Sequence, residues 1–283
     1  MKLHKKLWES AFHDTKKYMD YYFQHKAVKS GVYSDYEDDE LCAMAYFTPY
    51  KARYKGESCK VHYIVGVATE PEYRRQRRMT KLLEQGIAVC LQEDSPLVFL
   101  SPENPRVYDS LGFVGTYWRE TTMVQGEGKC WYRVSPFGGL KEKEKEMTAQ
   151  FAEKILKAEK FELYLEHSKE YYEEVEREMK ALEGEVLVLY EKTDIVAVAN
   201  CIYENAEWEV TELICDRDKG KEVVETICDY LKTEHLTIDD SYFIAGLEEK
   251  KIFRKKQEKP YIMYKVTSIE DSPLLRCYIN DIT

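Results

Sequence analysis

Apolar residues recur with two different spacings over the first 134 positions of the chain. Short runs rich in β-branched and aromatic side chains predict strands at residues 32–36, 41–50, 58–68, 97–100, 116–125 and 129–134. Apolar positions at helical spacing predict helices at residues 3–11, 14–27, 76–92 and 106–111. The last two strands are expected to pair with each other as an antiparallel hairpin. Strands interleaved with helices in this way predict an α/β domain with a mixed sheet.

A proline and two glycines interrupt this pattern at residues 136–139, and a charged helix is predicted after them at residues 141–160. A second series of elements follows. Its helices are expected at residues 168–182, where Ser168 is a suitable N-cap, and at residues 221–232. Its strands are expected at residues 161–165, 185–190, 195–203, 208–215, 241–245 and 261–266.

The second series repeats the first in outline, so we predict two domains of one fold. Their expected limits are residues 1–135 and 161–268, with a linker and bridging helix at 136–160 and a C-terminal tail at 269–283. The sequence contains no clear internal repeat, so this duplication depends on the order of the elements alone.

Composition narrows the classes of function. The 42 lysines and arginines are outnumbered by 52 aspartates and glutamates, giving a formal net charge of −10, which argues against general nucleic-acid binding. The eight cysteines are scattered without a Cys-x-x-Cys pair, which predicts reduced thiols and no metal site. The sequence has no signal-peptide pattern and no apolar run of about 18 residues, so we expect a soluble cytoplasmic protein without membrane contact.

Positive charge is concentrated where the strand at residues 58–68 leads into the helix at residues 76–92. Four arginines lie there: Arg74, Arg75, Arg77 and Arg78. Cations at a helix N-terminus oppose the macrodipole, whereas the unpaired N–H groups of that terminus attract an anion. The cluster therefore predicts a site for a phosphate-bearing ligand. The alternative is a solvated basic loop that tolerates the repulsion.

Three stretches resemble the GCN-related N-acetyltransferase (GNAT) superfamily, in the order that the family has them. YIVGVATEPEYRRQRRMTKLL at residues 63–83 is similar to its coenzyme A loop, whose signature is Gln/Arg-x-x-Gly-x-Gly/Ala. LWESAFHDTKKYMDYYF precedes it and FLSPENPRVYDSLGF follows it. The nearest likeness is to the "enhanced intracellular survival" branch, which implies two tandem GNAT-like acyl-CoA N-acyltransferase domains, the second without cofactor.

The resemblance implies an N-acetyltransferase that moves an acetyl group from acetyl-CoA to a primary amine of a small molecule or peptide. Val65 and Val67 would offer main-chain groups to the pantetheine arm, and Glu103 and Asn104 would contact the cofactor. Tyr108 would be the general acid that protonates the departing thiolate. The loop around the diphosphate would comprise Arg74, Arg75, Gln76, Arg77, Arg78 and Met79.

Two residues depart from the signature: Arg77 stands where it has its first glycine, and Met79 where it has glycine or alanine. Arg77 motivates the alternative hypothesis of a degenerate GNAT-fold protein that binds coenzyme A or a protein partner without turnover. Tyr108 has its own alternative, as a core tyrosine under a helix. No general base is assigned, because the branch supplies it from a third domain and this chain ends at Thr283. His62 is expected to be structural. The acceptor and the oligomeric state, a homo-oligomer included, stay open.

Overall fold

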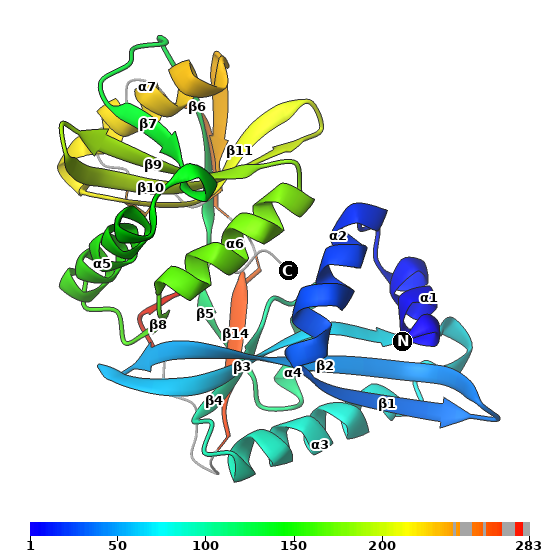
Figure 1. Ribbon diagram of the computed structural model, residues 1–283. Helices are drawn as coiled ribbons and strands as arrows, with labels where there is room; N and C mark the ends of the chain where they lie inside the picture. Colours follow the sequence, from blue (N-terminus) through cyan, green and yellow to red (C-terminus); the bar gives the residue numbers. More distant parts are fainter. Residues whose placement is uncertain (240–241, 244–250, 257–258, 268–274, 280–283) are drawn as a thin grey trace.

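The computed structural model describes residues 1–239, 242–243, 251–256, 259–267 and 275–279 and contains two β-sheets with helices packed on both (Figure 1). The first sheet has the strand order β15-β8-β2-β3-β4-β14-β5, with β1 beside β2. The second has the order β13-β6-β12-β11-β10-β9-β7. The mixed α/β fold is therefore confirmed. The strand predicted at residues 241–245 lies largely outside the described residues.

The strands of the first sheet are β1 Gly31–Glu37, β2 Glu40–Tyr54, β3 Glu57–Thr69, β4 Leu97–Leu100, β5 Val114–Tyr117, β8 Leu163–Leu165, β14 Ile262–Val266 and β15 Cys277–Tyr278. Those of the second are β6 Glu120–Gln125, β7 Arg133–Pro136, β9 Glu185–Glu191, β10 Asp194–Glu204, β11 Glu207–Cys215, β12 His235–Ile238 and β13 Lys251–Lys256. The α-helices are α1 Lys2–Ala11, α2 Lys16–Tyr21, α3 Arg78–Gln92, α4 Arg106–Asp109, α5 Glu142–Ala158, α6 Lys169–Ala181 and α7 Gly220–Leu231. After α2 the chain continues as a π-helical turn, η1 Tyr22–Lys26, and a 3₁₀ turn, η2 Ala27–Lys29.

The hairpin predicted from residues 116–125 and 129–134 does not form. β5 ends at Tyr117 and pairs with β14, whereas β6 begins at Glu120 and pairs with β12 and β13 in the other sheet. β7 pairs with β9. Each sheet thus contains strands from both halves of the chain, and the domain limits at 1–135 and 161–268 remain a prediction.

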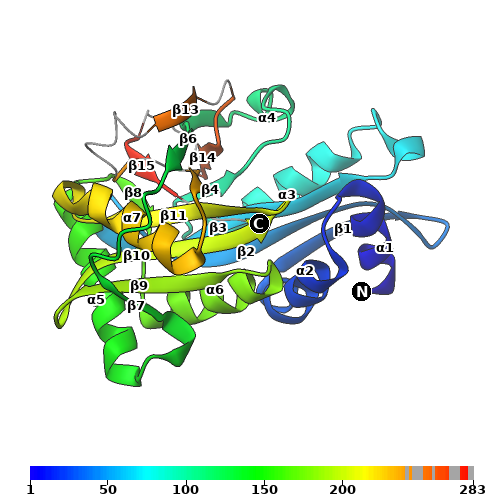
Figure 2. The same ribbon diagram turned by 90° about the horizontal axis from the view of Figure 1, so that it is seen from above.

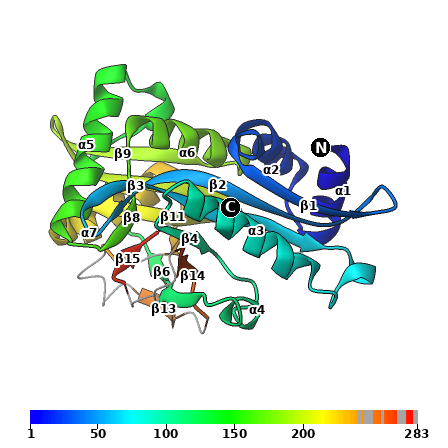
Figure 3. The same ribbon diagram turned by 90° about the horizontal axis from the view of Figure 1, so that it is seen from below.

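Helices cover both faces of the first sheet (Figures 1 and 3). α3 lies on one face, where Phe47, Leu83 and Val98 are buried in one core cluster. α1 and α2 lie on the other face, where α2 is next to α6 (Figure 2). We call the first sheet with α1 to α4 the first unit, and the second sheet with α5 to α7 the second unit. The larger core cluster on that side contains residues of both sheets, so the two units share a continuous apolar interior. No helix in the described part of the chain is long and apolar enough to cross a membrane.

The parallel strands β3 and β4 pair only at His62 with Val98 and Tyr63 with Phe99. Beyond Tyr63 they separate, and within the described residues that edge of β3 faces no other strand. A β-bulge lies at this point, because Gly66 and Val67 together oppose one residue of β2. Gly66 has a φ of +61°, and a Cβ there would lie 2.3 Å from Cζ3 of Trp8. Glycine is therefore required where α1 packs onto the bulge.

Gly66→Ala is expected to lower the free energy of unfolding more than Gly56→Ala does. Gly56 also has a positive φ, +89°, but no atom lies within 4 Å of a Cβ there. Both changes introduce backbone strain, whereas only Gly66→Ala forces overlap with Trp8, which adds about 1–3 kcal/mol. Urea denaturation of the two variants measures the difference. Equal losses would show that Trp8 yields without cost.

Candidate functional site

A cavity of about 670 Å³ opens where β3 and β4 separate. Its walls come from the C-terminal end of α1 and the turn after it, from β3, from the loop after β4 and from α4. Four of the residues predicted from the sequence line it: Val65, Val67, Glu103 and Tyr108. Residues that are distant in sequence thus meet at the edge of β3 that β4 leaves, and the separation of the two strands forms an open cleft.

Tyr108 lies on α4, a single turn directly after the loop that follows β4. The loop is held by Asn104, whose side-chain oxygen accepts a hydrogen bond from the Arg106 N–H at 3.2 Å. The Tyr108 ring packs against Phe113 with 5.8 Å between ring centroids. Burial raises the pKa of Tyr108 above its usual value. The hydroxyl therefore stays protonated at neutral pH and is available as a proton donor.

The arginine-rich loop lies between β3 and α3, and none of its residues from Arg74 to Met79 lines the cavity. Arg77 is the N-cap of α3 with φ +60° and provides no side-chain cap. The first N–H groups of α3 are consequently left for a ligand or water, as an anion site requires. Arg75 also has a positive φ, +62°. This loop geometry explains why a glycine suits the Arg77 position.

Arg78 is engaged by the protein itself. Its guanidinium forms ion pairs with Asp35, at 2.9 Å, and with Glu37, both on β1, and stacks on the Tyr73 ring at 4.9 Å. These contacts fasten the first turn of α3 to β1. The charge of Arg78 is therefore largely committed, and its main-chain N–H is the group best placed to meet an anion.

The other loop residues differ in their contacts. Nε of Arg74 donates to the Thr69 carbonyl at 3.1 Å and Nε2 of Gln76 to the Glu72 carbonyl at 3.4 Å. Met79, in the first turn of α3, is partly buried against the core cluster between α3 and the sheet. The guanidinium groups of Arg75 and Arg77 are exposed and have no partner within the described residues. These two side chains are the free cations of the loop.

Arg77→Gly is expected to be about 1 kcal/mol more stable than Arg77→Ala, because a Cβ in the left-handed region costs about 1–2 kcal/mol. Arg74 has a φ of −66°, and there the order should be reversed, since glycine only adds entropy to the unfolded chain. Denaturation of the four variants gives both differences. The same order at both positions would contradict a conformational origin.

Several cavity residues were not found from the sequence: Trp8, Phe12, His13, Asp14 and Lys259. Nε1 of Trp8 donates to Asp14 at 2.7 Å. Nζ of Lys259 donates to the Glu103 carbonyl at 2.9 Å and pairs with its carboxylate at 3.2 Å. The aromatic residues near the N-terminus were a weak sequence indication of a ligand site. No sequence pattern around Lys259 indicates that it lies at this cavity.

His62 does not line the cavity. It is buried with Nδ1 3.1 Å from the Ser95 hydroxyl, and burial lowers its pKa. Within the described residues, no group of three histidines, cysteines or acids is arranged to hold a metal ion.

The second sheet has a similar separation of strands. β11 and β12 pair in parallel only at Glu209 with Thr237 and Val210 with Ile238. Near the other end of β11, however, Phe243 is fully buried, and its carbonyl accepts a hydrogen bond from Sγ of Cys215 at 3.5 Å. A side chain of the protein thus packs at the position that would correspond to the cleft of the first sheet.

The chain was compared with known proteins by sequence and by structure. Residues 2–115 match the family model for an acetyltransferase (GNAT) domain. A probable N-acyltransferase from Enterococcus faecalis V583, a conserved protein of unknown function, aligns over 94% of this chain and 70% of its own, with a TM-score of 0.72 and 13% identity. Eis1 from Mycobacterium abscessus aligns over 95% of this chain and 71% of its own, with a TM-score of 0.64 and 9% identity. A comparison with curated proteins gave no significant match.

The N-myristoyltransferase of Saccharomyces cerevisiae, solved with bound myristoyl-CoA, aligns over 81% of this chain and 68% of its own, with a TM-score of 0.51 and 12% identity. At such identities the structural likenesses establish the fold alone. They cover both sheets, so the expected pair of tandem GNAT-like units is confirmed. Residues 2–115 of this chain thus match the model of a GNAT acetyltransferase domain, and the chain as a whole has a fold similar to two GNAT-like units.

Proposed function

We propose that the chain transfers an acetyl group from acetyl-CoA to a primary amine of a small molecule or peptide. The observation that carries this proposal is the unpaired edge of β3, which runs from the uncapped N-terminus of α3 into a cavity that Tyr108 lines. An extended chain can bind such an edge as an added strand, and a diphosphate can bind the helix terminus. The family match at residues 2–115 supports the same class of reaction.

The cofactor would be held along β3 and the loop after it. Val65 and Val67 would offer their main-chain groups to the pantetheine arm. The N–H groups at the start of α3 and the free guanidinium groups of Arg75 and Arg77 would bind the diphosphate, with Arg74, Gln76, Arg78 and Met79 shaping the loop. Glu103 and Asn104 lie on the opposite side, in the loop after β4. Bound there, acetyl-CoA supplies an activated thioester.

The chain's own groups would then assist aminolysis. An N–H of the bulge at Gly66 and Val67 lies outside the regular ladder and is suited to polarise a carbonyl. The Tyr108 hydroxyl would give its proton to the departing thiolate. Asp14 places a carboxylate at the end of the cavity nearest α1, where a cationic amine would enter. The amine must lose its proton before it attacks, and the base remains unassigned.

Acetyl-CoA binding measured by calorimetry, together with thiol release in the presence of a panel of polyamines and other primary amines, tests the proposal. Saturable binding with amine-dependent thiol release supports the enzyme. Binding of longer acyl-CoA thioesters in its place would move the proposal to another acyl donor. Absence of binding up to about 1 mM acetyl-CoA would reject cofactor binding altogether.

The alternative, a GNAT-fold protein that binds coenzyme A or a protein partner without turnover, is favoured by Arg77 alone. Its side chain adds bulk at the position where the family signature has a glycine, which lets the diphosphate come close to the backbone. The Arg77 side chain could hinder the diphosphate by its bulk or bind it by its charge, and Arg77→Gly separates these two effects. Tighter acetyl-CoA binding by the variant identifies bulk as the obstacle, whereas weaker binding identifies Arg77 as a phosphate contact. Binding without thiol release in both proteins would support the alternative.

A further inference from the structure

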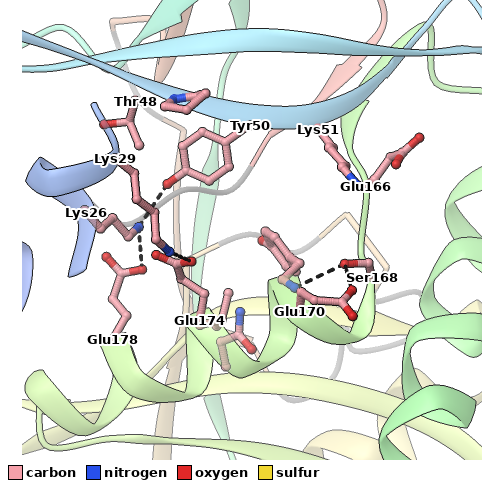
Figure 4. A pocket seen from close by; sticks show the side chains of 14 residues that line it. Lys26, Lys29, Thr48, Tyr50, Lys51, Glu166, Ser168, Glu170, Glu174 and Glu178 are labelled. Atoms are coloured by element: carbon pink, nitrogen blue, oxygen red, sulfur yellow. Dashed lines mark hydrogen bonds and ion pairs between the residues drawn. The ribbon is translucent and has the colours of Figure 1, made fainter. Parts of the chain in front are cut away.

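A short segment, residues 166–168, connects β8 of the first sheet to α6 of the second unit. Figure 4 shows Glu166 and Ser168 beside a cavity of about 260 Å³ between β2 and α6. His167, between these two residues in the chain, lines neither this cavity nor the one at β3 and is only 1% exposed. The segment that joins the units therefore contains a fully buried titratable group.

Both ring nitrogens of His167 face hydrogen-bond acceptors. Nδ1 lies 2.8 Å from the Leu165 carbonyl oxygen, which can only accept. Nε2 lies 3.1 Å from one carboxylate oxygen of Glu212 on β11, whose other oxygen accepts from Nδ2 of Asn200 at 2.9 Å. A neutral imidazole has a single N–H and cannot satisfy both acceptors. His167 is therefore an imidazolium that forms a buried ion pair with Glu212.

A second carboxylate approaches the His167 segment from another helix. The main-chain N–H of His167 donates to Glu153 on α5 at 2.7 Å. The neighbouring Glu166 is paired with Arg53 of β2, at 2.9 Å, so its charge is balanced. In the part of the chain that the structure describes, His167 is the only cation that pairs with Glu212.

Helix α6 adds neutral rings to these surroundings. The ring centroids of Tyr171 and Tyr172 lie 4.5 Å and 5.6 Å from that of His167. Burial alone would lower the pKa of His167, but the Glu212 carboxylate, the hydrogen bonds of both ring nitrogens and the charge of Glu153 together raise it above its usual value. The imidazolium is thus favoured by its neighbours although it is buried.

We propose that His167 is a pH-sensitive joint between the two units, which holds them together as an imidazolium and loosens their junction when it loses its proton at alkaline pH. Deprotonation would leave a lone pair of Nε2 facing the Glu212 carboxylate in a site without water, where neither group finds another partner. The contact that fastens the end of β8 to β11 of the second sheet would then become repulsive. This joint does not depend on the proposed acyl transfer.

The pH dependence of urea denaturation of the full chain tests the proposal. Because the pKa of His167 is raised in the fold, its stabilisation is complete below the unfolded value of about 6.5 and is lost as the pH rises through the raised value. Over that interval the unfolding equilibrium constant of the wild type should rise relative to that of His167→Gln, by up to about tenfold per pH unit. A constant ratio from about pH 6.5 to 9.5 would overturn the proposal.

His62→Gln is the matched control. His62 is also buried, but its Nδ1 faces the Ser95 hydroxyl, which can donate as well as accept, and burial lowers its pKa. The effect of His62 on stability therefore lies on the acidic side of about pH 6.5, and His62→Gln should keep the alkaline dependence of the wild type. Loss of that dependence in His62→Gln, with its retention in His167→Gln, would assign it to the wrong histidine and refute the joint.

Nitrogen-15 NMR of the histidine-labelled wild type measures the protonation state directly. An ordinary histidine is largely neutral at about pH 7.5, whereas His167 should have both ring nitrogens protonated. Its signals are assigned by their absence in His167→Gln or, should that variant fail to fold, by their proximity to the ring protons of Tyr171. A neutral His167 at this pH would overturn the proposal.

Hydrogen exchange distinguishes a joint from a general stabiliser of the fold. In the wild type, the protection factors of amides in residues 163–172 should fall as the pH rises through the titration of His167, by up to about tenfold per pH unit, and those of α3 should fall less. In His167→Gln this local decrease should be absent. An equal decrease in both segments of the wild type would show that the proton stabilises the whole fold and would refute a joint.

Discussion

Tyr108→Phe is expected to lower kcat for the proposed acetyl transfer by about 10²–10⁴-fold, the usual contribution of a positioned general acid. The phenylalanine keeps the ring contact with Phe113 but cannot donate a proton. Because the Tyr108 hydroxyl has no hydrogen-bond partner within the described residues, the free energy of unfolding should change by less than about 0.5 kcal/mol. The measurement is steady-state thiol release together with urea denaturation.

Tyr190→Phe is the matched control for this variant. The Tyr190 hydroxyl likewise has no hydrogen-bond partner in the described residues, but it is buried and belongs to β9 in the second sheet, away from the cavity. Its removal should leave thiol release unchanged. Loss of a general acid lowers kcat at least about 10²-fold. If kcat of Tyr108→Phe falls by less than about threefold, Tyr108 has no part in the mechanism.

The pH dependence of the wild type provides an independent check. Burial raises the pKa of Tyr108, so the acid form is present at neutral pH and is lost only when the pH rises above that raised value. The rate of a step that needs the Tyr108 proton should therefore fall on the alkaline side, later than for an exposed tyrosine. This alkaline limb should be absent from the residual rate of Tyr108→Phe.

Local elements of the first unit followed directly from the apolar pattern. β4 begins at Leu97 and ends at Leu100 as predicted, because four fully buried apolar residues between polar turns leave no other periodicity. α3 was predicted from residue 76 but begins at Arg78, since Arg77 adopts a left-handed conformation that cannot continue a helix. The shift could not be predicted, because arginine ordinarily favours helix.

Strand pairing was predicted poorly where the partners are distant in sequence. β5 pairs with β14, and β8 pairs with β2 and β15. Nothing in these short segments specifies a partner more than 100 residues away, and the pairing is decided by the shared core of the two sheets. The predicted hairpin failed for this reason: β6 and β7 lie in one sheet but pair with strands distant in sequence, β6 with β12 and β13 and β7 with β9.

In the candidate site, too, local motifs could be predicted from the sequence and contacts between distant segments could not. The stretch from Val65 to Met79 and the segment around Tyr108 each carry a local motif, so the sequence could identify them. Lys259 beside Glu103 and Arg78 against Asp35 are contacts between elements far apart in the chain. Charges of this kind have no local signature, because any surface lysine or acid has the same appearance in a sequence.

The interface between the two units contains a charge pair whose disruption should have a large effect on stability. The Lys26 and Glu178 side chains are each 3% exposed, and Nζ of Lys26 also donates to the Tyr50 hydroxyl at 2.9 Å. Lys26→Met leaves the Glu178 carboxylate buried without its cation, which is expected to lower the free energy of unfolding by about 3–5 kcal/mol. Urea denaturation measures the loss.

Lys29→Met is the matched control. It breaks an ion pair of the same length to the same helix, but the Lys29 and Glu174 side chains are 53% and 26% exposed, so the loss should stay below about 1 kcal/mol and decrease further in salt. Lys26→Met combined with Glu178→Leu should recover most of the loss, because no unpaired charge then remains buried. Equal losses in the two single variants would show that water reaches Glu178 once Lys26 is removed, and that the units are joined by apolar packing.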